Sequence, residues 1–120
     1  MKSEIIVALD VPTAAEIPAI VNALPERIRY YKIGLELFAA AGPDTLRFLA
    51  DTGRSIFLDL KLHDIPRTVA RAVEAAGQHN VALMTVHAGG GRNMLTAAAA
   101  AAAALGDRAP KLVAVTTLTS

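Results

Sequence analysis

The sequence predicts an α/β fold built on a parallel β-sheet, and three observations carry this prediction. Short β-branched runs alternate with longer stretches in which apolar residues recur at helical spacing. The runs begin at positions 5, 30, 56, 83 and 112, so successive starts lie 25 to 29 residues apart, about one βα unit. Hydrophobic residues make up 53% of the 120 residues, which is enough apolar material for a packed core. Strands that alternate with crossover helices imply parallel pairing.

The β-branched runs and the helical patterns between them define the expected elements. The first helix is marked by Thr13 and Glu16, spaced as in a capping box, although Pro18 delays its start by about a turn. The second helix is opened by Gly42-Pro43-Asp44. Strands are expected at Ile5–Leu9, Tyr30–Gly34, Ile56–Leu60, Leu83–His87 and Leu112–Thr117.

Two further helices are expected in the second half of the chain. Ile65-Pro66 opens the third, which runs over Ile65–Gln78. Gly89-Gly90-Gly91 precedes the fourth, which contains eight consecutive alanines, Ala97–Ala104, and alanine is the strongest helix former. The glycine run is interpreted as turn chemistry, with a phosphate-binding loop as the weaker alternative.

Two architectures fit this pattern of elements. A five-stranded doubly wound sheet, as in a flavodoxin-like binding or regulatory module, matches the length of 120 residues. A (β/α)8 barrel needs roughly 210 residues, so this chain supplies about four and a half of its units. Because the sequence stops directly after the fifth predicted strand without a closing helix, we expect residues 1–120 to be the N-terminal half of a single barrel domain.

Composition excludes several classes of function. Twelve Lys and Arg against eleven Asp and Glu give a formal net charge of +1, so no basic field for nucleic acid is present. There is no cysteine for a disulfide, a thiolate metal site or a Cys nucleophile. No segment has the length of a signal peptide or a membrane span. We therefore expect a cytoplasmic protein that acts on a small molecule.

Charged residues interrupt two strands that should be apolar if both faces of the sheet were covered. Lys32 lies inside the second strand, and Asp59 and Lys61 lie at the carboxyl end of the third, followed by Asp64. Alternating signs would keep all four ionised, and this edge of an α/β sheet is where active sites occur. The alternative is structural: Asp64 as the N-cap of the third helix, and Asp59 with Lys61 as a surface pair.

The segment around these charges resembles the Asp-x-Lys-x-x-Asp-Ile-Pro signature of the orotidine 5'-monophosphate decarboxylases. It runs here from Asp59 to Pro66. Arg67 stands where that family commonly has Asn. The related sugar-phosphate decarboxylases and hexulose-phosphate synthases share the charged positions, but they use magnesium and generally lack Ile-Pro. The resemblance extends in order from Ile5 to Ser120 through Ile6–Asp10, Tyr31–Gly34, Val86–Gly90 and Leu118–Ser120.

This resemblance implies a TIM barrel that forms a homodimer and converts orotidine 5'-monophosphate to uridine 5'-monophosphate and CO2 without cofactor or metal. It assigns Lys61 as the donor of a proton to pyrimidine C6 and places Asp59 against the departing carboxylate. Lys32 would bond both Asp59 and the ribose, and Asp10 would hold ribose hydroxyl groups.

The resemblance also implies that the active sites are shared between subunits. Asp64, Ile65 and Thr68 would reach into the neighbouring subunit's site, and Ser120 would lie near the pyrimidine. Phosphate-binding loops are expected after later strands, outside this chain. The three histidines, His63, His79 and His87, have no metal-binding spacing, and His87 is interpreted as a hydrogen-bonded structural residue.

Overall fold

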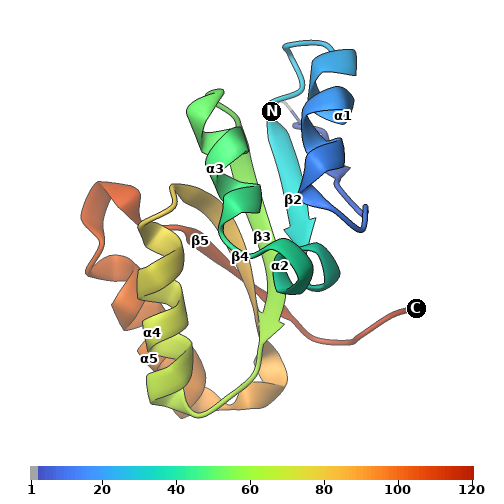
Figure 1. Ribbon diagram of the computed structural model, residues 1–120. Helices are drawn as coiled ribbons and strands as arrows, with labels where there is room; N and C mark the ends of the chain where they lie inside the picture. Colours follow the sequence, from blue (N-terminus) through green and yellow to red (C-terminus); the bar gives the residue numbers. More distant parts are fainter. Residues whose placement is uncertain (1–2) are drawn as a thin grey trace. The chain divides into compact units, whose positions relative to one another are not determined.

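Figure 1 shows the computed structural model of the chain, which describes residues 3–120. The chain forms two compact units, one ending at Asp59 and the other beginning at Leu60. The strands pair in parallel, and their order in the sheet, β1-β2-β3-β4-β5, is their order in the sequence.

The strand order of the first unit decides between the two architectures. In this unit β2 pairs with both β1 and β3, through registers such as Ala8↔Lys32 and Lys32↔Phe57. A flavodoxin-like sheet instead has its first strand between the second and third. The flavodoxin-like alternative is therefore wrong, and the observed order is that of a barrel. The elements of this unit are β1 (Ile6–Ala8), the short 3-10 turn η1 (Ala14–Glu16), α1 (Ile17–Ala23), β2 (Tyr30–Gly34), α2 (Leu35–Ala41), α3 (Asp44–Asp51) and the start of β3 (Ser55–Leu62).

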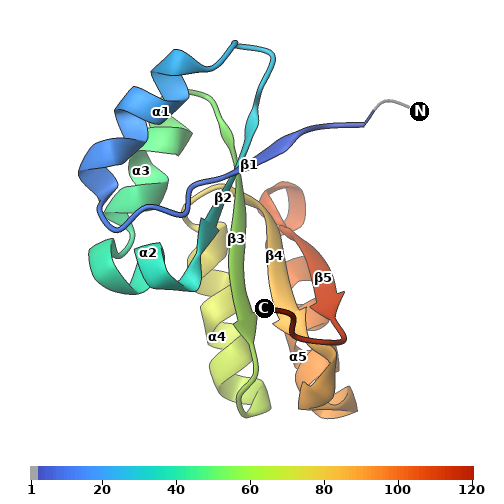
Figure 2. The same ribbon diagram turned by 90° about the vertical axis from the view of Figure 1, so that its right-hand side faces the viewer.

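Burial alternates along β2 and β3 because helices cover only one face of these strands. Tyr31 and Ile33 of β2, with Ile56 and Leu58 of β3, are fully buried. Their sequence neighbours Lys32 and Asp59 lie on the opposite face and are only partly buried. Figure 2 shows α1 and α3 together on one side of the strands of this unit. Charged side chains are tolerated in these strands because the second face is not covered by helices.

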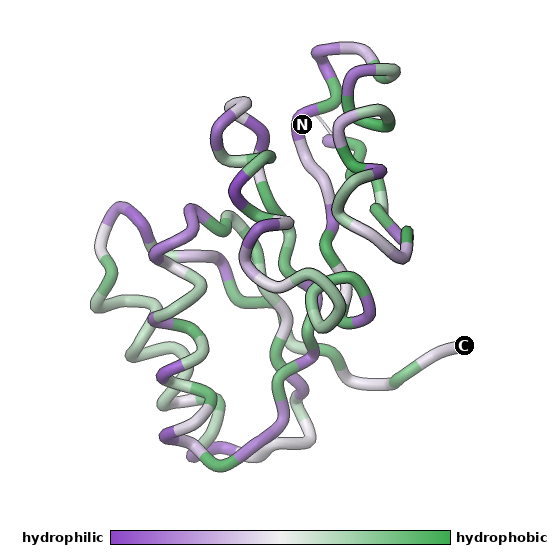
Figure 3. Tube along the Cα trace, in the orientation of Figure 1, coloured by the Kyte–Doolittle hydropathy of each residue, from purple (hydrophilic) through white to green (hydrophobic). Residues whose placement is uncertain are grey.

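In the second unit two helices pack against each other beside a pair of strands. Val69 and Val73 of α4 are fully buried, as are Met94 and Ala98 of α5. Only one face of the alanine tract is buried: Ala98, Ala101 and Ala102 are buried, whereas Ala99 and Ala100 are exposed. Figure 3 shows a hydrophilic stretch after β3, where the chain leads into α4. The elements are the end of β3, α4 (Pro66–Gly77), β4 (Val81–His87), η2 (Ala88–Gly90), α5 (Arg92–Ala103), η3 (Gly106–Arg108) and β5 (Lys111–Val115).

All four expected helices and all five expected strands are present within residues 3–120, with small shifts in their ends. One further helix, α2, was not predicted, and two local interpretations are wrong. Thr13 makes no cap bond to the backbone; its hydroxyl donates instead to the Glu16 carboxylate at 3.0 Å. Asp64 is not the N-cap of α4, because Ile65 occupies that position. The expected delay by Pro18 is confirmed, since α1 begins at Ile17 after η1.

Both outer strands carry exposed apolar side chains. Ile6 of β1 is 40% exposed and Val113 of β5 is 44% exposed, and Leu118 beyond β5 is 64% exposed. These are large apolar residues that a sheet edge in water would rarely carry. Within residues 3–120, no helix is both long and apolar enough to cross a bilayer.

Candidate active site

Three predicted site residues form an ion cluster in the first unit. The Lys32 ammonium lies 3.7 Å from Asp59 Oδ2 and 3.8 Å from Asp10 Oδ1. Both separations are ion-pair distances slightly longer than a hydrogen bond. The expected pairing of Lys32 with Asp59 is therefore present, and Asp10 joins it as a second carboxylate.

The parallel register brings these three residues together. Asp59 lies opposite Gly34, two residues beyond Lys32 on the same face of β2. The backbone N–H of Leu9 donates to the Lys32 carbonyl at 3.0 Å, which carries the next residue, Asp10, to the end of β2. Burial differs strongly between the two carboxylates: the Asp59 side chain is 12% exposed and that of Asp10 is 70% exposed. Asp59 is thus the carboxylate whose charge is poorly screened by water.

Lys61 lies two residues after Asp59 on β3 and has an unusual backbone. Its φ is +50°, in the left-handed region that side chains with a Cβ rarely adopt. A regular strand would place the side chains of Asp59 and Lys61 on one face, and the left-handed backbone interrupts this alternation at Lys61 itself. The backbone N–H of Lys61 donates to the hydroxyl of Thr85 at 2.9 Å, and Thr85 is only 3% exposed. Thr85 was not identified from the sequence; its one signal is a hydroxyl within the buried run of β4.

Two histidines follow at the ends of β3 and β4. The rings of His63 and His87 are stacked, with centroids 5.2 Å apart and an interplanar angle of 22°. His87 Nδ1 accepts the backbone N–H of Gly89 at 2.9 Å, so the expected hydrogen bonding of His87 is present. Gly91 has a φ of +89° immediately before α5, in agreement with turn chemistry in the glycine run.

The remaining predicted site residues lie on exposed positions. Asp64 Oδ1 accepts the backbone N–H of Ile65 at 2.7 Å, and the Ile65 side chain is 65% exposed. Thr68 is exposed on α4, and Ser120 is exposed beyond β5. Their roles stay predictions. Over the described part of the chain, no three or more His, Asp or Glu side chains are grouped as metal ligands.

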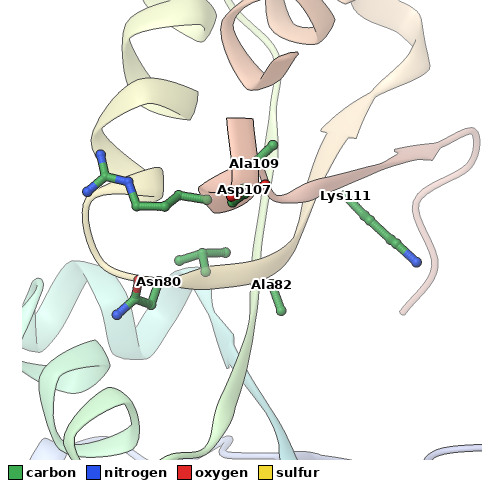
Figure 4. Close-up of a pocket in the computed structure, with 7 residues that line it drawn as sticks. Asn80, Ala82, Asp107, Ala109 and Lys111 are labelled. Atoms are coloured by element: carbon green, nitrogen blue, oxygen red, sulfur yellow. The ribbon is translucent and has the colours of Figure 1, made fainter. Parts of the chain in front are cut away.

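A cavity of about 320 Å³ lies elsewhere in the second unit, at the amino ends of β4 and β5. Figure 4 shows that Asp107 and Lys111 on its rim do not converge, since the Lys111 side chain extends away from the other labelled residues. The Arg108 guanidinium donates a hydrogen bond to Gln78 Oε1 at 3.0 Å. The cavity contains none of the predicted site residues.

Comparison with known proteins matches this chain along its whole length. The model of the orotidine 5'-phosphate decarboxylase / HUMPS family matches residues 3–120. The orotidine 5'-phosphate decarboxylase of Gloeothece citriformis is 48% identical over 120 residues, which are all of this chain and 51% of that protein. That of Thermosynechococcus vestitus is 50% identical over 98% of this chain and 49% of the relative. The chain thus spans about half the length of these relatives.

Solved structures agree with the sequence comparisons. The crystal structure of orotidine 5'-phosphate decarboxylase from Lactobacillus acidophilus superposes with a TM-score of 0.89 at 39% identity, covering 98% of this chain and 55% of that one. The enzyme from Methanocaldococcus jannaschii, solved with the inhibitor BMP, gives 0.84 at 21% identity and supports the fold. The fold is therefore that of the first strands and helices of a TIM barrel. With the family model covering nearly every residue, this chain belongs to the orotidine 5'-phosphate decarboxylase / HUMPS family.

Proposed function

We propose that this chain carries the reacting residues for decarboxylation of orotidine 5'-monophosphate to uridine 5'-monophosphate and CO2. The observation that carries the proposal is the Lys32 ion cluster with the weakly exposed Asp59, two residues before a lysine with a left-handed backbone. Charged groups with little exposure to solvent and residues with a strained backbone are both concentrated at functional sites. Here they occupy the positions at which the sequence resembles the decarboxylase signature.

The proposed reaction uses the negative charge of Asp59 first and the positive charge of Lys61 second. Asp59 faces the substrate carboxylate, and repulsion between the two anions raises the energy of the bound substrate relative to the transition state. As the C–C bond breaks, CO2 leaves and the electron pair remains at C6. The Lys61 ammonium stabilises this negative charge and gives its proton to C6, so that a C–H bond forms and the neutral amine is reprotonated from water. Lys32 pairs with Asp59 and orients it, while Asp10 binds the ribose hydroxyl groups.

A second copy of the protein completes the proposed site. Ile65 is a large apolar side chain with 65% exposure at the start of α4, next to the exposed Asp64. Asp64, Ile65 and Thr68 are all exposed at the start of α4, so they are accessible to a second copy of the protein. We propose that Asp64, Ile65 and Thr68 insert into the neighbouring subunit's site and that Ser120 lies near the pyrimidine.

The proposal is tested by supplying the portion that the relatives have in addition. A chimera joins residues 1–120 to the C-terminal half of the Thermosynechococcus vestitus decarboxylase, which is 50% identical over the shared part. The chimera should convert orotidine 5'-monophosphate to uridine 5'-monophosphate, followed by absorbance, whereas the C-terminal half alone should not. Turnover of a sugar phosphate that requires added magnesium, with none of the nucleotide, would instead favour the HUMPS branch of the family.

A further inference from the structure

Lys61 occupies a backbone conformation that its own side chain disfavours. At a φ of +50° the Cβ of an L-residue crowds the neighbouring carbonyl, so a lysine rests there only when surrounding groups hold it. Lys61 is also the last residue but one of β3, where a regular parallel ladder would give its N–H a backbone carbonyl. In this conformation the Lys61 N–H donates to a side chain.

Thr85 supplies this side chain from the adjacent chain segment of the same unit. Its hydroxyl oxygen accepts the Lys61 N–H at 2.9 Å and is part of a side chain that is 3% exposed. Water has little access to compete for this bond. A buried threonine on a β-strand also has a restricted χ1, so the hydroxyl is held in a defined direction.

A second contact joins the same two segments two residues further along. His63 follows Lys61 by two positions, His87 follows Thr85 by two positions, and their rings stack at 5.2 Å. The His87 ring is itself fixed, because its Nδ1 accepts the Gly89 N–H. Side chains of β4 thus contact the end of β3 and the residue after it at two places, the Lys61 backbone N–H and the His63 ring.

From this arrangement we infer that Thr85 is a positioning residue for Lys61: its buried hydroxyl holds the Lys61 backbone in the left-handed conformation that aims the ammonium. The inference rests on the proposed function for its catalytic consequence. Its structural part stands on the bond and the backbone angle alone. Thr85 does not touch the substrate in this account, and its effect reaches the reaction through Lys61.

The test removes the hydroxyl and then restores it. Thr85→Val keeps the β-branched shape without an acceptor, and Thr85→Ser keeps the acceptor without the methyl group. Thr45→Val is the matched control, because Thr45 is also fully buried and its hydroxyl donates to the Gly42 carbonyl at 2.8 Å, in the first unit. If Thr85→Val fails to fold, Thr85→Ala takes its place and is compared with Thr85→Ser, from which it differs by the hydroxyl.

The first readout needs no catalysis. In the isotope-labelled 120-residue chain, amide hydrogen exchange of Lys61 should accelerate at least tenfold in Thr85→Val and its Cα and Cβ shifts should move away from left-handed values. Thr85→Ser and Thr45→Val should leave both unchanged. Unchanged exchange and shifts in Thr85→Val would overturn the inference, whatever reaction the protein performs.

The second readout uses the chimera described above. Thr85→Val should lower kcat at least tenfold and change KM less than twofold, since ribose and phosphate contacts do not depend on Lys61 orientation. Thr85→Ser should stay within twofold of the parent. Equal losses in Thr85→Val and Thr45→Val would show a general loss of stability and overturn the positioning role. An inactive parent chimera would count against the proposed function, while the exchange data would still decide the role of Thr85.

Discussion

The ion pair of Lys32 with Asp59 should contribute much more to the free energy of unfolding than the ion pair of Lys32 with Asp10, although the two N–O distances are nearly equal. Coulomb's law gives about 4.5 kcal/mol for unit charges 3.7 Å apart at an effective dielectric constant of about 20. Desolvation offsets much of this, and exposed pairs retain about 0–1 kcal/mol. With Asp59 12% and Asp10 70% exposed, we expect coupling energies of about 1–2 kcal/mol for Lys32 with Asp59 and below about 0.5 kcal/mol with Asp10.

Double-mutant cycles measure these two couplings directly. The variants Lys32→Met, Asp59→Asn and Asp10→Asn, and the two double variants, are unfolded with urea at pH 7 in low and high salt. Added salt should reduce the coupling with Asp10 more than that with Asp59, because the exposed pair is screened. The Glu4–Arg29 pair is the control for an exposed ion pair, because both side chains are exposed. The pKa of Arg29 is raised first by its hydrogen bond to Glu4 and second by the negative charge of Glu4. A coupling with Asp10 as large as that with Asp59 would refute the reasoning from burial.

Three further predictions concern catalysis, packing and association. Asp59→Asn in the chimera should lower kcat and tighten binding of the nucleotide, because the anion that repels the substrate carboxylate is removed; weaker binding in a competition assay would contradict this role. Gly77→Ala should lower the stability of the chain by about 1–2 kcal/mol in urea unfolding, since the new methyl group would overlap with the Leu105 side chain; an unchanged midpoint would show that Leu105 moves aside freely. The 120-residue chain alone should self-associate, because Ile6 and Val113 expose apolar surface on its outer strands. It should also be a poor decarboxylase, because the phosphate-binding loops are expected after later strands; a monomer by light scattering that has enzyme-like turnover by absorbance would overturn this.

The positions of the strands could be predicted from the sequence because each strand is marked by its own run of β-branched residues. Tyr30–Gly34 is predicted to the residue, and the other strands differ by one or two positions at their ends. α2 was missed because it follows Gly34 directly and has no Pro, Ser, Thr or Asp at its start to mark it. Thr13 and Glu16 have the spacing of a capping box, but spacing does not decide whether the hydroxyl accepts from the backbone or donates to the carboxylate, as it does here.

For the candidate site, residue types were predictable and their geometry was not. The cost of burying isolated charges indicated that Lys32 would pair with Asp59, and the structure confirms it. The left-handed backbone of Lys61 has no sequence signal, since neither glycine nor asparagine stands there. A hydroxyl within the apolar run of β4 marks Thr85 as unusual, but its partner could not be predicted, because Lys61 lies 24 residues away and is reached only through the tertiary fold.

The most direct test of the account is the turnover of the chimera carrying Lys61→Ala, measured beside its binding of the product nucleotide. Decarboxylation should be nearly abolished while binding is partly retained, because the ribose and phosphate contacts do not use the ammonium group. Retained binding also shows that the variant is folded. Near-normal decarboxylation by Lys61→Ala would contradict the central claim that this lysine protonates C6.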